Sequence, residues 1–143
     1  MARKRTAKKP RKSFLRISPV CISATLWAVI LWVLIFAEVT IVMFMPALAG
    51  LLIEQKLIHL LLLPIMTALC AAMFFNGSKV KPTLGYGLYI GIYFLAVGTV
   101  LDLLITVPLF TGFWELYTQW SLWLGFAEGL VACSVVGFWL EKK

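Results

Sequence analysis

Four long apolar stretches constrain this chain more than any other feature. They cover residues 20–44, 57–75, 84–107 and 119–140. Each is about 18 residues or longer with few charges, which is typical of a membrane-spanning helix. The chain has 143 residues, of which 62% are hydrophobic and only 13% charged. A soluble core of this size cannot hide so much apolar surface. The sequence therefore predicts an all-α integral membrane protein, a bundle of four transmembrane helices.

The end of the first helix is the least defined boundary. Residues 17–53 are apolar for longer than one crossing requires, yet they are too short for two helices and a turn. We expect the helix to end near Pro46, with residues 47–53 forming a hairpin or an interfacial segment. Residues 54–56 (Glu-Gln-Lys) would then form a turn in water. Further along, Pro108 is expected to close the third helix.

The distribution of Lys and Arg predicts the orientation. Twelve of the thirteen lie in the N-terminal segment 1–18, the loop 76–82 or the tail 141–143, and Lys56 alone lies on the opposite side. Positive residues are retained in the cytoplasm, so both termini are expected there, flanking a transmembrane domain of residues 19–140. We expect a multi-pass protein of the bacterial inner (plasma) membrane. A cleaved or mitochondrial leader is the alternative, but the first stretch exceeds the roughly 7–15 residues of a signal-peptide core.

The basic N-terminal segment is expected to be disordered and to contact anionic lipid. It carries eight positive residues and no acid, and each positive charge near an anionic membrane surface contributes about 1 kcal/mol of attraction. Nothing besides charge favours nucleic acid. The expected partner is therefore the lipid bilayer, through Arg3, Lys4, Arg5, Lys8, Lys9, Arg11, Lys12 and Arg16.

Ionisable residues inside the apolar stretches form the candidate functional site. Glu38, Asp102 and Glu128 each interrupt a predicted helix, and His59 lies near the start of another. Counted from the midpoint of each span at 1.5 Å per residue, Glu38, His59 and Asp102 lie roughly 10 Å outward of the midplane, and Glu128 lies close to it. Because a charged carboxylate in hydrocarbon costs at least about 2.5–3.5 kcal/mol, such groups are protonated, paired or open to water. We expect His59 to pair with an acid, and the set to bind a proton or a cation.

Each of these residues also has a structural interpretation. Glu38, His59 and Asp102 are close enough to the interface to extend their polar ends into the headgroups. Glu128 could simply hydrogen-bond a neighbouring helix, a contact worth about 0.6 kcal/mol on average.

Glycines at helical spacing mark the expected helix contacts. Small residues three, four or seven positions apart share a face and allow two membrane helices to approach closely. One such face includes Asp102, and the other encloses Glu128, so close packing and the buried acids are expected to coincide. The glycines are Gly91 and Gly98 in the third helix, and Gly125, Gly129 and Gly137 in the fourth.

Two functions remain open from the sequence. The first is transport of protons, small cations or a cationic solute through intramembrane carboxylates, in a homo-oligomer, because four short helices barely enclose a pathway. The second is an accessory or scaffold subunit that packs against a larger membrane partner and has no activity of its own.

Enzymatic and cofactor chemistry are not favoured. The chain has no signature of a common enzyme, although Asp102 and Glu128 could in principle act as an acid–base pair. Three scattered cysteines form no zinc or disulfide pattern. Met, His59 and Cys70 side chains suit Cu(I), but methionines at helical spacing are more often packing residues. We expect no metal and no cofactor.

Overall fold

The computed structural model describes residues 18–44, 52–110, 115 and 117–143. The elements are α1 (Pro19–Phe44), α2 (Leu52–Gly77), α3 (Leu84–Leu101), the π-helix η2 (Asp102–Thr106), α4 (Val107–Phe110) and α6 (Trp120–Glu141). Four helical stretches are long and apolar enough to cross a membrane: Pro19–Val42, Leu57–Gly77, Leu84–Leu109 and Trp120–Glu141. The prediction of an all-helical chain with four such helices is confirmed. The basic residues 3–16 lie outside the described part of the chain.

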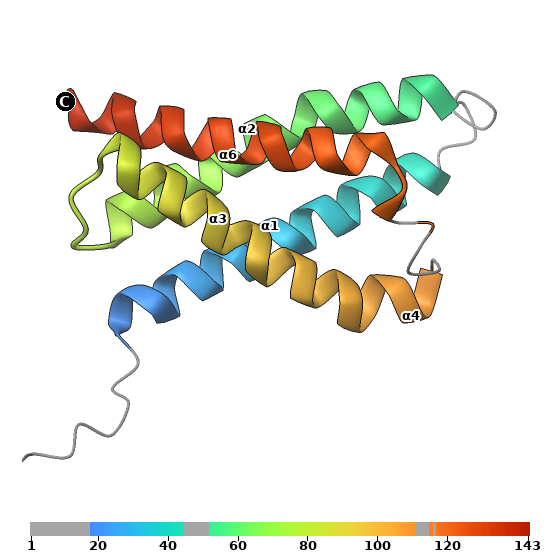
Figure 1. Ribbon diagram of the computed structural model, residues 1–143, viewed down its shortest axis with the longest axis horizontal. Coiled ribbons are helices and arrows are strands. Elements are labelled where there is room, and N and C mark those ends of the chain that lie inside the picture. The colour runs from blue at the N-terminus through green and yellow to red at the C-terminus, as the bar shows by residue number, and fades with distance from the viewer. Residues whose placement is uncertain (1–17, 45–51, 111–114, 116) are drawn as a thin grey trace, which may run out of the picture.

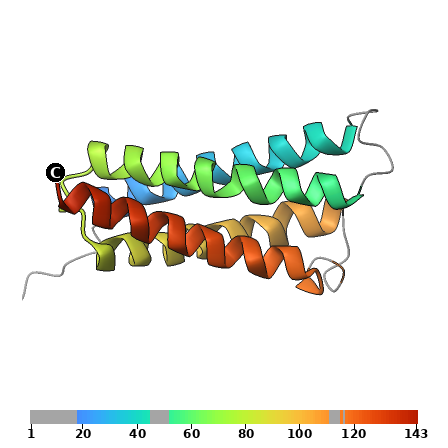
Figure 2. The same cartoon turned by 90° about the horizontal axis from the view of Figure 1, so that it is seen from above.

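The four long helices form a bundle in which each packs against two neighbours (Figures 1 and 2). α1 packs against α2 and α3, and α6 packs against the same two helices. The first residues of α1 and α3 share one end of the bundle with the last residues of α2 and α6 (Figure 1). We call this the terminal end, and the opposite end the far end.

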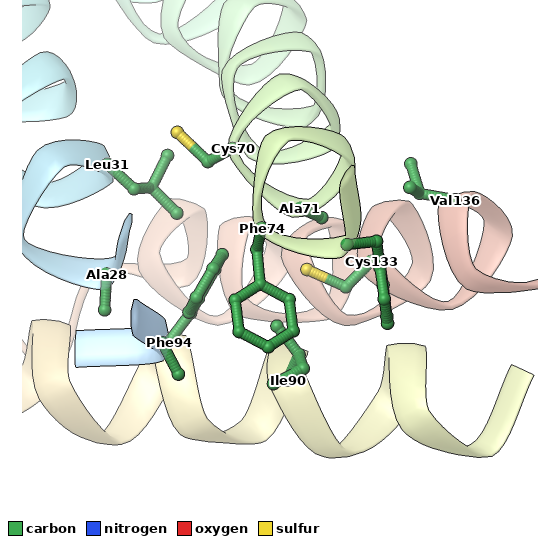
Figure 3. Close-up of a cluster of buried hydrophobic side chains, with 11 residues drawn as sticks. Ala28, Leu31, Cys70, Ala71, Phe74, Ile90, Phe94, Cys133 and Val136 are labelled. Atoms are coloured by element: carbon green, nitrogen blue, oxygen red, sulfur yellow. The ribbon is translucent and has the colours of Figure 1, made fainter. Parts of the chain in front are cut away.

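An apolar core fills the half of the bundle nearest the terminal end (Figure 3). Phe74, Ile90 and Cys133 are its largest fully buried side chains. Because lipid tails are as apolar as these side chains, close packing rather than removal from water holds membrane helices together. The outward faces carry exposed large apolar side chains, such as Leu61 and Leu104, which suits contact with lipid.

Backbone contact between α3 and α6 defines this half of the bundle. A Cβ added at Gly87 would lie 2.9 Å from the Cα of Ser134, and one added at Gly137 would lie 3.0 Å from the Cα of Gly87. At Gly91 it would meet the Cβ of Cys133 at 3.2 Å. Only glycine allows the two helices to lie this close. Gly87 was not among the glycines singled out from the sequence.

The remaining predicted contact glycines behave differently from one another. A Cβ at Gly125 would lie 2.8 Å from the Leu63 side chain of α2. At Gly98 and Gly129 it would meet nothing within 4 Å. The glycine that directly follows Glu128 is therefore not at a tight helix contact.

The predicted turn at residues 54–56 is wrong, because α2 already begins at Leu52. The polar residues therefore form the start of a helix. Helix α1 is described as far as Phe44, and the expected helix end near Pro46 lies, with the rest of residues 45–51, outside the described residues.

Pro108 does not close the third helix, which continues through η2 and α4 to Phe110. Proline lacks an N–H and its ring collides with the carbonyl four residues earlier in an α-helix. The turn before it is wider than an α-turn: the N–H of Val107 bonds the carbonyl of Asp102, five residues back. This change of hydrogen-bonding register is how the helical path accommodates Pro108.

Candidate functional site

Glu38 and His59 form an ion-pair contact between α1 and α2. The His59 Nδ1 and Glu38 Oε2 atoms are 2.7 Å apart. The Glu38 side chain is only 9% exposed, whereas that of His59 is 26% exposed. The second carboxyl oxygen of Glu38, Oε1, is inaccessible and has no hydrogen-bond partner. The Glu38 side chain is therefore enclosed within the chain, and the His59 imidazole connects the pair to the surface.

Asp102 is held by two hydrogen bonds to the same oxygen. The indole N–H of Trp32 on α1 donates to Oδ1 at 2.9 Å, and the hydroxyl of Thr106 donates to it at 2.8 Å. The Thr106 bond spans η2, so the widened turn and the carboxylate are one local structure. π-turns of this kind are rare and occur frequently at functional sites.

Tyr117 lies within the electrostatic field of Asp102. Its phenol is outside the four membrane-spanning stretches, three residues before α6. The pKa of Tyr117 is raised, first by burial and second by the negative charge of Asp102. The Trp32 ring also stacks on Phe36, with ring centroids 5.2 Å apart. The Trp32 indole is thus in contact with this carboxyl group, whose charge also acts on the Tyr117 phenol.

Glu128 on α6 has no hydrogen bond to its Oε2 atom, which is inaccessible. It lies nearer the terminal end than Asp102 does. Gly91 of α3 lies against Leu130 of α6, and the two helices run in opposite directions, so Glu128 is level with about residue 93. Asp102 is then about 13 Å further toward the far end at 1.5 Å per residue.

The structure therefore arranges the four predicted residues on three levels. Asp102 is level with Trp32, and Glu38 lies six residues further along α1, about 9 Å beyond it. The sequence placed Glu38, His59 and Asp102 at one depth, whereas α1 and α3 are offset along the bundle. Only Glu38 and His59 are brought into contact.

Trp32 and Tyr117 were not anticipated as parts of the site. The four-residue spacing of Asp102 and Thr106 was visible in the sequence, because residues four apart share a helix face. The contribution of Trp32 depends on how α1 and η2 are placed side by side, for which the sequence contains no local signal.

Among the side chains that the structure describes, which do not include that of Lys56, the base within ion-pair distance of one of the three acids is His59. The same residues contain no group of three or more His, Cys, Asp or Glu side chains able to hold a metal ion. The site thus has three carboxyl groups and one imidazole as its ionisable chemistry.

Comparisons with known proteins identify no relative. The chain matches no protein-family model, no curated protein and no solved structure. Its function is therefore argued from its own residues.

Proposed function

We propose that this protein transports protons or small cations across a membrane, as a homo-oligomer. Asp102 and Glu128 act as the binding groups within the membrane. The Glu38–His59 pair is the binding group furthest from the cytoplasm. Both termini lie in the cytoplasm, and the membrane is the bacterial inner membrane. This orientation follows from the distribution of Lys and Arg, which concentrates twelve of thirteen on one side.

The observation that carries the proposal is that buried carboxyl oxygens of this chain have no hydrogen-bond partner. Three acids lie inside helices long enough to span a membrane, and two of them have an inaccessible oxygen without a hydrogen-bond partner. Ionising such a group in hydrocarbon costs at least about 2.5–3.5 kcal/mol. A proton removes this cost and needs no additional space. Proton binding therefore suits Glu38 and Glu128.

The spacing of the acids supports an oligomer. The rise between Glu128 and Asp102 is about 13 Å, too long for direct transfer of a proton between two carboxyl groups. Water or side chains must fill that distance, and a single bundle of four helices offers little room between them. We therefore propose that the path is completed in the oligomer, for whose contacts the apolar outer faces are available.

An accessory-subunit role is the second candidate, and it ranks lower for a specific reason. Acids that await a partner protein should present their oxygens outward. The unpartnered oxygens of Glu38 and Glu128 instead have essentially no accessible surface within the chain itself.

Flux measurements in proteoliposomes test the proposal. The full-length protein is reconstituted with a pH-sensitive dye inside, and proton, Na⁺ and K⁺ gradients are applied in turn. Asp102→Asn and Glu128→Gln are compared with wild type, and Glu141→Gln, an exposed position at the terminal end, is the matched control. We expect both buried variants to lose flux and the control to retain it, with unchanged circular dichroism and oligomer size. Absence of flux above empty liposomes under every gradient refutes the proposal and favours the subunit role.

A further inference from the structure

The three buried acids differ in what they can bind. Glu38 and Glu128 each have an unpartnered oxygen that is inaccessible, which admits a proton but nothing larger. Asp102 has no oxygen of this kind. Both of its hydrogen bonds go to Oδ1, so Oδ2 is the oxygen left for a ligand.

The groups that contact Asp102 are hydrogen-bond donors. Two of them are directed at one oxygen, and hydrogen bonds to an ionised group are stronger than neutral ones. Both donors are neutral, so they bring no positive charge to the carboxyl group. The ion pair found among the side chains that the structure describes is Glu38–His59, and it does not involve Asp102. A cationic ligand would supply that positive charge.

The chemistry around Asp102 selects among cations. A hard metal ion needs a shell of several oxygen ligands, and no group of acidic, His or Cys residues in the described ranges provides one. Aromatic rings are present instead: Trp32 is hydrogen-bonded to the carboxylate and stacked on Phe36, and Tyr117 lies in its field. Rings beside one carboxylate attract organic cations, which bring apolar surface and a weakly hydrated charge.

We propose that Asp102, with the Trp32 indole hydrogen-bonded to it, binds a monovalent organic cation of the alkyl- or arylammonium class. Asp102 is the counter-ion. The Trp32 ring lines the site and is held in position by the hydrogen bond from its N–H to Asp102. The widened turn of η2 spans both Asp102 and its second donor, Thr106. This substrate class rests on the proposed transport function.

Binding of tetraphenylphosphonium, a weakly hydrated monovalent organic cation, tests the inference. Equilibrium dialysis uses the full-length protein in detergent micelles, corrected for empty micelles, with triphenylphosphine oxide as a neutral probe of similar shape. We expect saturable binding of the cation only, weakened at least about tenfold in Asp102→Asn because the counter-charge is lost. Trp32→Leu should weaken it about threefold to tenfold through loss of the ring. Glu141→Gln, at an exposed position at the terminal end, serves as the control and should bind like wild type.

Tyr117 gives a second readout that needs no variant at Asp102. Because the charge of Asp102 contributes to the raised pKa of Tyr117, a bound cation should move the phenol's ionisation toward lower pH. Its signal is isolated as the absorbance difference between wild type and Tyr117→Phe. Equal binding of the charged and neutral probes, or wild-type affinity in Asp102→Asn, overturns the inference.

The outcomes for the two proposals are separable. Proton flux in liposomes without binding of tetraphenylphosphonium refutes the organic-cation site and leaves the proposed function standing. Saturable binding that depends on Asp102, with no flux of protons, metal cations or tetraphenylphosphonium, supports the binding site and refutes transport.

Discussion

Replacing Gly87 with alanine should force α3 and α6 apart. The added Cβ would lie 2.9 Å from the Cα of Ser134 and closer still to the carbonyl oxygen of Cys133. Both are backbone atoms, so no side-chain rotation relieves the contact. Non-bonded carbon atoms settle at about 3.5–4.0 Å, so the helices must separate by at least about 0.6 Å or bend. Overpacking of this kind costs about 1–3 kcal/mol.

Gly129→Ala is the matched control for this steric cost. Gly129 is also buried within a membrane-spanning helix, but a Cβ there would meet nothing within 4 Å. Both substitutions gain up to about 1 kcal/mol of helix propensity, so this term cancels in the comparison. We expect Gly87→Ala to be less stable than Gly129→Ala by about 1–3 kcal/mol.

The assay is reversible unfolding of both variants in mixed micelles with increasing SDS, followed by circular dichroism and tryptophan fluorescence. Equal stability of the two variants would refute the reasoning, because it would mean that α3 and α6 are not in backbone contact at Gly87.

Three further predictions concern the polar residues. Glu38→Ala and His59→Ala should be non-additive in the same unfolding assay, with a coupling energy of at least about 1 kcal/mol; additive effects contradict the observed pair. The charge of Asp102 is the smaller cause of the raised Tyr117 pKa. Asp102→Asn should therefore make Tyr117 ionise at lower pH, as measured by absorbance, without returning its pKa to the ordinary value. An unchanged Tyr117 titration would show that the charge of Asp102 does not act on the phenol. Thr106→Val removes a donor to Asp102 and should lower stability by about 1.5–3 kcal/mol, whereas wild-type stability would show that this bond contributes nothing.

Hydropathy and length were sufficient to predict the four helices, because a helix satisfies its own backbone groups in lipid and needs a continuous apolar stretch of about this length to cross it. Two predictions, the turn at residues 54–56 and the helix end at Pro108, were wrong because the local preference of these residues did not determine the structure there. Residues 54–56 are polar, which suits both a turn and the first turn of a helix, and their sequence does not separate the two. Pro108 is normally a helix terminator, but the five-residue hydrogen bond from Val107 to Asp102 lets the helix pass it.

The candidate site was predictable only in part, because its contacts depend on how helices are offset along one another. The sequence identified Glu38, His59, Asp102 and Glu128 from their cost in lipid, and it anticipated that His59 would pair with an acid. It could not place Trp32 against Asp102, since a stagger of one helical turn would select a different residue. The same limit explains the glycines: Gly87 and Gly98 are equally small, but only Gly87 faces a neighbouring backbone.

Proton transport is tested by measuring flux through the full-length protein in liposomes and comparing Glu128→Gln with Glu141→Gln. Glu128 has a buried oxygen without a partner, whereas Glu141 is exposed at the end of the same helix. The account predicts that the first substitution abolishes flux and that the second leaves it at the wild-type rate, both in correctly folded protein. Wild-type flux in Glu128→Gln, or none in any sample, would contradict it.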